Sequence, residues 1–173
     1  RWLELKQKEW FINAGEITQI GVESQLVLQL IKKEEYRIVK GLELSNSFTY
    51  SDFRFTKYTY LGNKVPGVPS TVLVTGWTMR FPHQFYVYGQ HYYASAIFLN
   101  DENSVAADAY SVFLLKAGSN LIRNKHFTLN LSAGIDNLLN EKYSLGNDLN
   151  AMGGRYYNAA MPRNFFCKVE VSL

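Results

Sequence analysis

Apolar and polar residues alternate along several segments of this chain, and that alternation constrains its fold more than any other feature. From Phe127 to Asp136, apolar residues hold most odd positions, and small or polar residues hold the even ones. Successive side chains of a β-strand point to opposite faces, so a period of two predicts a strand with one apolar and one polar face. The same pattern recurs in the last segment and around residues 20–30 and 42–50. The chain is therefore predicted to be all-β.

Eight strands are predicted, and most of them are long. Helix signals are weak: the best, Asn137 to Tyr143, fits a strand end that runs into a loop. Many strands have 11 to 15 residues, whereas strands of about 5–6 residues are most common in globular proteins and about 9–11 tilted residues cross a bilayer. The predicted strands cover residues 1–12, 16–30, 37–51, 70–81, 84–98, 109–119, 125–138 and 161–173.

The connections between the strands alternate between short and long. The short ones are Lys32–Tyr36, Phe81–His83 and Asn120–Asn124, and the long ones are Asp52–Val68, Asn100–Asp108 and Leu139–Ala160. Tight turns at one end and long loops at the other are typical of antiparallel outer-membrane barrels, whose short turns are periplasmic. The pattern therefore favours a membrane β-barrel.

Composition excludes several classes of protein. The 173 residues suffice for one domain, and 18 basic against 15 acidic residues give a net charge of +3, too small to indicate a nucleic-acid-binding protein. The single cysteine, Cys167, rules out an internal disulfide framework. No apolar run approaches the ~18 residues of a membrane-spanning helix. Alternating strands average to neutral hydropathy, so a membrane β-barrel remains open.

The chain carries no motif from which a reaction can be assembled. It has no GxSxG, Walker or HExxH sequence, so we expect neither an enzyme nor a cofactor. The run Asn100-Asp101-Glu102-Asn103 lacks the ligand spacing of a dedicated calcium site and fits a solvated turn. His83, His91 and His126 have no ligand partner at short spacing, so no metal site is predicted.

One loop segment combines groups that suit a ligand. Gly153-Gly154 gives flexibility, Arg155 a planar cation, and Tyr156 and Tyr157 two rings for stacking. Such a set fits an anionic or aromatic ligand. The same tyrosines also suit packing of the loop onto the rim of a barrel. Arg155, Tyr156 and Tyr157 are the candidate ligand-binding residues.

Five motifs, in order along the chain, resemble the C-terminal part of TonB-dependent outer-membrane receptors. Any one of them is weak evidence, but together they extend almost from one end of the chain to the other. They are Asn13-Ala14-Gly15 with Gly21-Val22-Glu23; Ser47-Phe48-Thr49-Tyr50-Ser51-Asp52 with Gly62-Asn63-Lys64-Val65-Pro66-Gly67-Val68-Pro69; Asn100-Asp101-Glu102-Asn103 with Tyr110; Gly134-Ile135-Asp136-Asn137-Leu138-Leu139-Asn140-Glu141-Lys142-Tyr143; and Arg155-Tyr156-Tyr157-Asn158 with Pro162-Arg163-Asn164-Phe165-Phe166.

This resemblance implies a bacterial outer-membrane protein with a 22-stranded barrel, of which residues 1–173 supply about eight C-terminal strands. The plug domain and the earlier strands lie outside this sequence. Receptors of this kind bind a scarce nutrient, commonly a ferric siderophore, and import it with energy from TonB, which ExbB and ExbD energise. The last strand is also the signal for the barrel assembly machinery, although it usually ends in an aromatic residue and here ends in Leu173. The ligand could equally be haem, cobalamin or a glycan.

Two other interpretations stay open at this stage. A self-contained eight-stranded outer-membrane barrel, structural or adhesive, would close on its own and would need its luminal charges to pair closely. A soluble β-sandwich or lipocalin-like binder would have to bury Phe127, Leu129 and Leu131 in a core. In a membrane barrel those three side chains face lipid instead, and Thr128 and Asn130 face the lumen.

Overall fold

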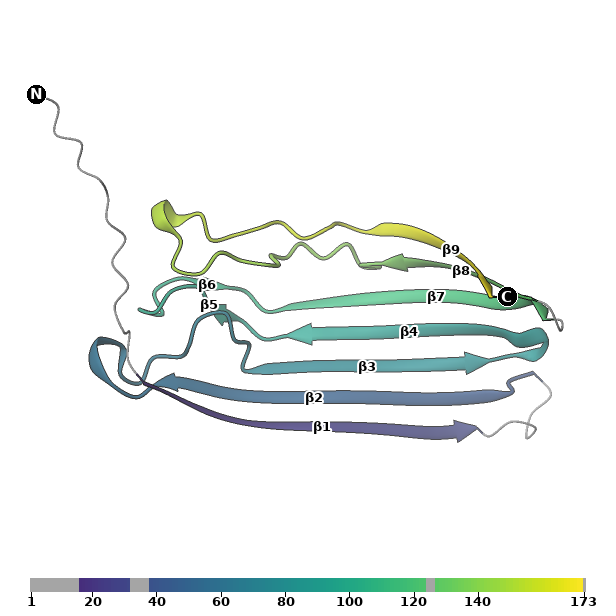
Figure 1. Cartoon of the computed structure of the whole chain (residues 1–173), viewed down its shortest axis with the longest axis horizontal. Coiled ribbons are helices and arrows are strands. Elements are labelled where there is room, and N and C mark those ends of the chain that lie inside the picture. Colours follow the sequence, from purple (N-terminus) through teal and green to yellow (C-terminus); the bar gives the residue numbers. More distant parts are fainter. Residues whose placement is uncertain (1–15, 32–37, 124–126, 173) are drawn as a thin grey trace, which may run out of the picture.

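The computed structural model describes residues 16–31, 38–123 and 127–172. Seven strands form one antiparallel sheet in which each strand pairs with the next along the order β1-β2-β3-β4-β7-β8-β9 (Figure 1). These strands are β1 (Ile17–Ile31), β2 (Gly41–Phe55), β3 (Thr71–Arg80), β4 (Phe85–Ala94), β7 (Tyr110–Arg123), β8 (Thr128–Asp136) and β9 (Asn164–Ser172). The short strands β5 (Ile97–Phe98) and β6 (Ala106–Ala107) pair in a separate hairpin, and three single-turn 3₁₀ helices are η1 (Tyr58–Tyr60), η2 (Pro82–Gln84) and η3 (Met152–Gly154).

Seven of the eight predicted strands are confirmed, and the eighth, at residues 1–12, lies outside the described residues. Several boundaries differ from the prediction by three or four residues. β2 continues to Phe55 because β1 pairs with it up to that residue, Ile17 lying opposite Phe55. β4 stops at Ala94, since the chain leaves the sheet there for the β5–β6 hairpin.

The long connections gather at one end of the sheet and the turns at the other (Figure 1). The turn at Phe81–His83 is confirmed: the Phe81 N–H donates to the Phe85 carbonyl oxygen at 2.8 Å, and His83 and Gln84 both have positive φ, 57° and 58°. The predicted turn at Asn120–Asn124 starts too early, because a bulge after Asn120 lets β7 continue to Arg123. The predicted turn at Lys32–Tyr36 lies outside the described residues.

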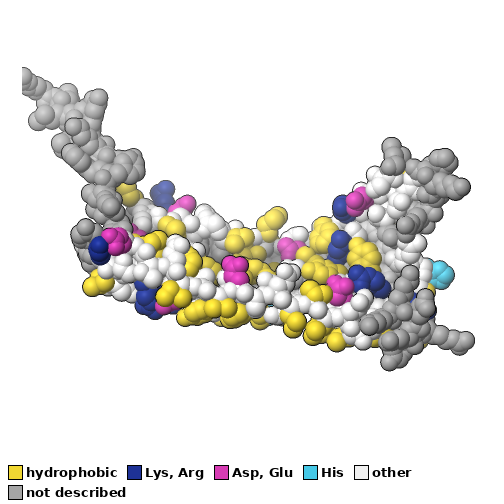
Figure 2. Space-filling view, turned by 60° about the horizontal axis from the view of Figure 1, so that its bottom comes forward, with side chains coloured by type: hydrophobic (Ala, Val, Ile, Leu, Met, Phe, Trp, Pro, Cys, Tyr) yellow, Lys and Arg dark blue, Asp and Glu magenta, His cyan; other side chains and the backbone are white. Residues whose placement is uncertain are grey.

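The sheet is a single layer, and it separates two kinds of side chain. Figure 2 shows hydrophobic side chains along its convex lower surface and a hollow on the other side. The convex face carries, among others, Leu26, Leu44, Trp77, Leu115, Leu131 and Val169, all related by the strand register. The concave face carries mostly polar residues, including Gln25, Ser47, Gln90, Lys116 and Lys168. The predicted facing of Leu129 and Leu131 against Thr128 and Asn130 agrees with this register.

Little of the described chain is buried. The buried apolar side chains are Phe55, Ala94, Leu99 and Ala107, all at the loop end. Large apolar side chains of the convex face stay exposed, for example Val169 at 63% and Ile20 at 62%. A sheet normally packs at least one face against another layer, and no second layer covers this one among the described residues. Those residues also contain no helix long and apolar enough to cross a membrane.

Candidate ligand site at the loop end

Hydrogen bonds between the three long loops, residues 56–70, 95–109 and 137–163, join them into one rim. The Asn63 side chain donates to the Asp101 carbonyl oxygen at 2.8 Å, and the Gly67 N–H donates to the Phe98 carbonyl oxygen at 2.8 Å. These bonds join the first loop to the second.

The third loop is attached to the second through two hydrogen bonds of Asn150. The Asn150 N–H donates to the Leu99 carbonyl oxygen at 2.9 Å, and Oδ1 of Asn150 accepts from the Asp101 N–H at 3.0 Å. Leu99 itself has no exposed surface. Because each loop is bonded to a neighbour, the rim is held in a defined shape over the sheet.

Three tyrosines stack below the rim on the concave face. Tyr92 of β4 and Tyr110 of β7 have ring centroids 5.8 Å apart, and Tyr143 from the third loop stacks on Tyr110 at 4.4 Å. Burial raises the pKa of the Tyr143 phenol, and the Asp136 carboxylate raises it further. Tyr143 therefore remains a neutral hydrogen-bonding group at physiological pH.

A cavity of about 320 Å³ lies beside this stack. Tyr92 and Tyr110 form part of its wall, and Leu145 and Leu149 of the third loop contribute apolar surface. Asp108 is the carboxylate among its lining residues. Small-molecule sites combine mainly apolar and aromatic walls with a few polar groups, and this cavity has that character.

The structure places Arg155, Tyr156 and Tyr157 on the third loop, away from the wall of this cavity. The Tyr157 hydroxyl donates to the Ala106 carbonyl oxygen at 2.8 Å, so this side chain anchors the loop to β6. Tyr157 is still 56% exposed, and its ring meets the Tyr156 ring edge-on, with centroids 6.5 Å apart.

Arg155 is exposed and makes no ion pair with a described residue. It follows Gly153 and Gly154, whose positive φ values of 72° and 75° form the loop tip. The candidate residues thus divide into an anchor, Tyr157, and an exposed cation, Arg155.

Sequence reasoning did not assign Tyr92 and Tyr110 to a site. The two side chains share the concave face because β4 pairs with β7, Ala94 lying opposite Tyr110. A period of two places each residue on a face, and the predicted antiparallel order makes the two strands neighbours, but the register that brings Tyr92 close to Tyr110 does not follow from the sequence. The described residues contain no cluster of His, Cys, Asp and Glu that could hold a metal ion.

Comparison with solved structures gives close matches in fold. The chain aligns with the siderophore receptor PiuA from Acinetobacter baumannii with a TM-score of 0.70 and 22% identity, over 90% of this chain and 22% of that one. It aligns with the ferric yersiniabactin uptake receptor FyuA from Yersinia pestis with a TM-score of 0.67 and 19% identity, over 92% of this chain and 23% of that one.

A third match is the ferric citrate transporter FecA, with a TM-score of 0.67 and 17% identity over 74% of this chain and 20% of that one. No family model and no curated protein matches the sequence. The chain thus spans about a fifth to a quarter of the length of the solved structures it matches. Its seven-stranded sheet, which does not close on itself in the described residues, has the fold of part of a TonB-dependent receptor barrel.

Proposed function

We propose that this chain is the C-terminal part of the barrel of a TonB-dependent outer-membrane receptor that imports a ferric siderophore or another iron complex. The observation that carries the proposal is the one-layer sheet with an apolar convex face, in the arrangement of the matched barrels. In the whole receptor the chain works with a plug domain and with TonB, which ExbB and ExbD energise. The barrel assembly machinery inserts it.

The convex face fits lipid. Exposed apolar side chains lie on this face of several strands, and monomeric soluble proteins rarely expose large contiguous apolar patches. In a bilayer these side chains leave water, while each strand between the edges pairs its backbone groups with two neighbours. The outer membrane is therefore the location that this surface favours.

Two pairs of polar side chains on the convex face lie within hydrogen-bond distance. The Asn46 amide donates to Oγ1 of Thr75 at 2.8 Å. His91 lies 3.2 Å from the Ser111 hydroxyl and stacks on Phe113 with a centroid distance of 4.4 Å. A polar group in hydrocarbon is costly unless hydrogen-bonded, so this pairing suits a surface in contact with lipid.

The loop end supplies the ligand-facing surface of the proposal. The bonded rim, the tyrosine stack and the cation of Arg155 lie at the end with the long loops, which in outer-membrane barrels is extracellular. An anionic iron complex with aromatic groups is the ligand class that these side chains suit.

The two other interpretations receive less support. A self-contained eight-stranded barrel requires the edge strands to pair, and in the described residues β1 and β9 lie at opposite edges of the sheet. A soluble sandwich requires a second layer over the apolar face, and the described strands provide none.

The proposal is tested in a bacterial strain that lacks its own iron-complex receptors and expresses the full-length protein. We expect the protein in the outer-membrane fraction. We also expect accumulation of ⁵⁵Fe from ferric citrate, ferric yersiniabactin or ferric preacinetobactin, lost when TonB is deleted. FecA with ferric citrate serves as the positive control. An outer-membrane protein that accumulates none of the three overturns the assignment to iron uptake, and recovery in the soluble fraction overturns the membrane assignment.

A further inference from the structure

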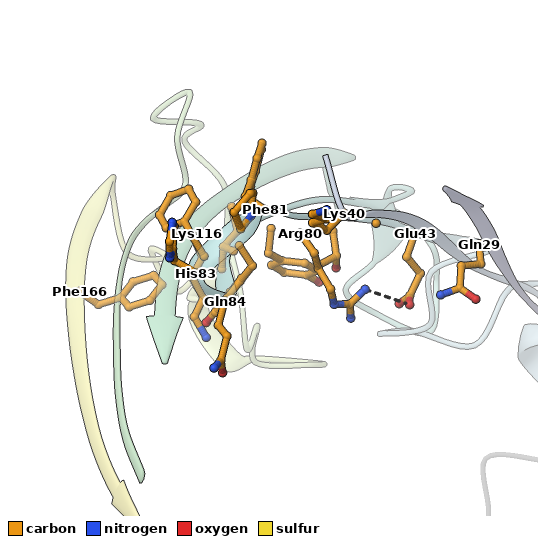
Figure 3. A pocket seen from close by; sticks show the side chains of 16 residues that line it. Gln29, Lys40, Glu43, Arg80, Phe81, His83, Gln84, Lys116 and Phe166 are labelled. Carbon is orange, nitrogen blue, oxygen red and sulfur yellow. Dashed lines mark ion pairs between the residues drawn. The ribbon is translucent and has the colours of Figure 1, made fainter. Parts of the chain in front are cut away.

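Two cavities on the concave side of the sheet differ in charge. The larger, of about 1150 Å³ at the turn end, is lined by three cations, Lys40, Arg80 and Lys116, and by one carboxylate, Glu43, which pairs with Arg80 at 3.6 Å (Figure 3). The smaller, of about 320 Å³, lies beside the tyrosine stack at the loop end. The described residues that line it include one carboxylate, Asp108, and no Lys, Arg or His. The loop-end cavity thus carries the opposite sign of charge.

The carboxylate of Asp108 is unpaired within the part of the chain that the structure describes. Asp108 lies between β6 and β7, and its side chain makes no hydrogen bond or ion pair there. The residue is exposed and also lines the cavity, so a ligand can reach the carboxylate from solvent. A cleft with charge of one sign and apolar walls concentrates ions of the opposite sign. This cavity therefore favours a cation.

Three other polar side chains of the wall are bonded within the protein. Oγ of Ser95 accepts from the Thr71 N–H at 3.1 Å. The Ser144 hydroxyl donates to the Asn158 carbonyl oxygen at 2.9 Å and is also bonded to the Asn147 amide oxygen. A ligand therefore meets one charged, unpaired acceptor in the wall rather than a ring of free hydrogen-bonding groups.

Aromatic rings complete the character of a site for an organic cation. The rings of Tyr92 and Tyr110 belong to the wall, with centroids 5.8 Å apart. The face of a tyrosine ring attracts a cation that lies within about 6 Å of its centroid. Leu145 and Leu149 add apolar surface. A hydrated metal ion would need several oxygen ligands, whereas one carboxylate among rings and leucines suits a cation with an apolar body.

We propose that this cavity binds an organic ammonium compound whose apolar body is about the size of one substituted ring. The ammonium group pairs with the Asp108 carboxylate, and the apolar body lies against Tyr92, Tyr110 and Leu149. The volume is near the lower end of the range of ligand pockets, about 300–1,000 Å³, which limits the ligand to this size. The site goes beyond the proposed function, because an anionic iron complex suits Arg155 on the third loop and is repelled by Asp108.

A series of ligands that differ in charge tests this site. The compounds 2-phenylethylammonium, 2-phenylethanol and 3-phenylpropionate share a phenyl ring on a two-carbon chain and carry a positive, a neutral and a negative group. Ligand-observed NMR titration of the purified full-length receptor in an aliphatic detergent gives each dissociation constant, and the detergent alone gives the background. We expect the ammonium compound to bind about tenfold more tightly than the alcohol, and the carboxylate to bind most weakly.

Variants of the wall separate the contribution of the charge from that of the rings. Asp108→Asn keeps the shape and removes the charge, so it should weaken binding of the ammonium compound about tenfold and leave the alcohol unchanged. Asp148→Asn is the matched control, because Asp148 is exposed on the third loop but does not line the cavity. Tyr92→Leu should weaken binding of the ammonium compound and the alcohol, whereas Tyr92→Phe keeps the ring and should change neither.

The site is overturned if the three compounds bind equally or if none of them binds. It is also overturned if Asp148→Asn weakens binding of the ammonium compound as much as Asp108→Asn does, since the attraction then comes from the charge of the whole rim. The titration uses no iron complex, so the two proposals fail separately. A receptor that imports iron and binds no ammonium compound overturns the site alone, and one that binds the compound and imports no iron overturns the iron-uptake function alone.

Discussion

Asn103 and the backbone of Lys64 form a reciprocal pair of hydrogen bonds across two loops. Nδ2 of Asn103 donates to the Lys64 carbonyl oxygen at 2.9 Å, and the Lys64 N–H donates to Oδ1 of Asn103 at 2.7 Å. The asparagine side chain thus bonds both the N–H and the carbonyl oxygen of Lys64, as a neighbouring strand would. Asn103 adopts a φ of 56°, a left-handed conformation that Asn tolerates better than most residues.

Replacing Asn103 should loosen the rim without disturbing the sheet. Each lost hydrogen bond costs about 0.5–1.5 kcal/mol, so Asn103→Gly should lower the opening free energy of residues 62–66 by about 1–3 kcal/mol. Asn103→Ala should lower it by about 1–2 kcal/mol more, because alanine is strained at positive φ. Amide hydrogen exchange measures both. Faster exchange in β2 and β3 instead of the loops would contradict the local role of this pair.

An arginine on the convex face should cost far more than one on the concave face. Leu26 and Gln25 are neighbours on β1 that point to opposite sides of the sheet. Leu26→Arg should destabilise the full-length receptor by about 2–4 kcal/mol if the residue lies near the bilayer midplane, and Gln25→Arg should cost little. Urea titration of folding in phospholipid vesicles gives both free energies, and equal costs would refute the face assignment.

Gly89 leaves room for the Trp77 indole on the neighbouring strand. A Cβ at Gly89 would lie 2.5 Å from the Trp77 ring, so Gly89→Ala should displace the indole and cost about 1–3 kcal/mol through overpacking. Gly41→Ala is the matched control, because its nearest contacts would be an ordinary 3.7 Å. The same urea titration compares them, and Trp77→Phe should relieve part of the Gly89→Ala penalty. Equal stability of the two alanine variants would contradict this close fit.

The exposed cation and rings of the third loop should contribute to ligand affinity. Replacing Arg155, Tyr156 and Tyr157 together by alanine in the full-length receptor should weaken ligand binding about tenfold, which equals about 1.4 kcal/mol. Tyr157→Phe removes only the hydroxyl that anchors the loop to Ala106 and isolates the structural share of the loss. Concentration-dependent ⁵⁵Fe uptake measures both variants, and an unchanged half-saturation concentration in the triple variant would remove these residues from the site.

The faces of the strands could be predicted from the sequence alone because a strand has a fixed period. Leu129 lies opposite Val171 and Leu131 opposite Val169, so the apolar residues of the two clearest segments share one face, as expected. The end of β2 was missed because Asp52 and Arg54 have the composition of a loop. In the structure both residues belong to β2, and Nε of Arg54 lies 2.8 Å from Oδ1 of Asp52 in an ion pair.

The site could be predicted less well, because it depends on contacts between distant segments. Arg155, Tyr156 and Tyr157 were selected by residue type, and nothing local reveals that Tyr157 bonds to Ala106, 51 positions earlier. The stack of Tyr92, Tyr110 and Tyr143 likewise needs the pairing of β4 with β7 and the fold of the third loop over both. Such contacts join residues far apart in the sequence, so the local alternation of apolar and polar residues does not predict them.

The strand directions in the sheet limit any barrel that contains it. β1 and β9 both run from the loop end to the turn end, since Ile17 lies beside Phe55 and Asn164 beside Asp136. An antiparallel barrel therefore closes between these two edges only through an odd number of additional strands. Seven plus an odd number is even, so the direction of two edge strands already imposes the even strand count of bacterial outer-membrane barrels.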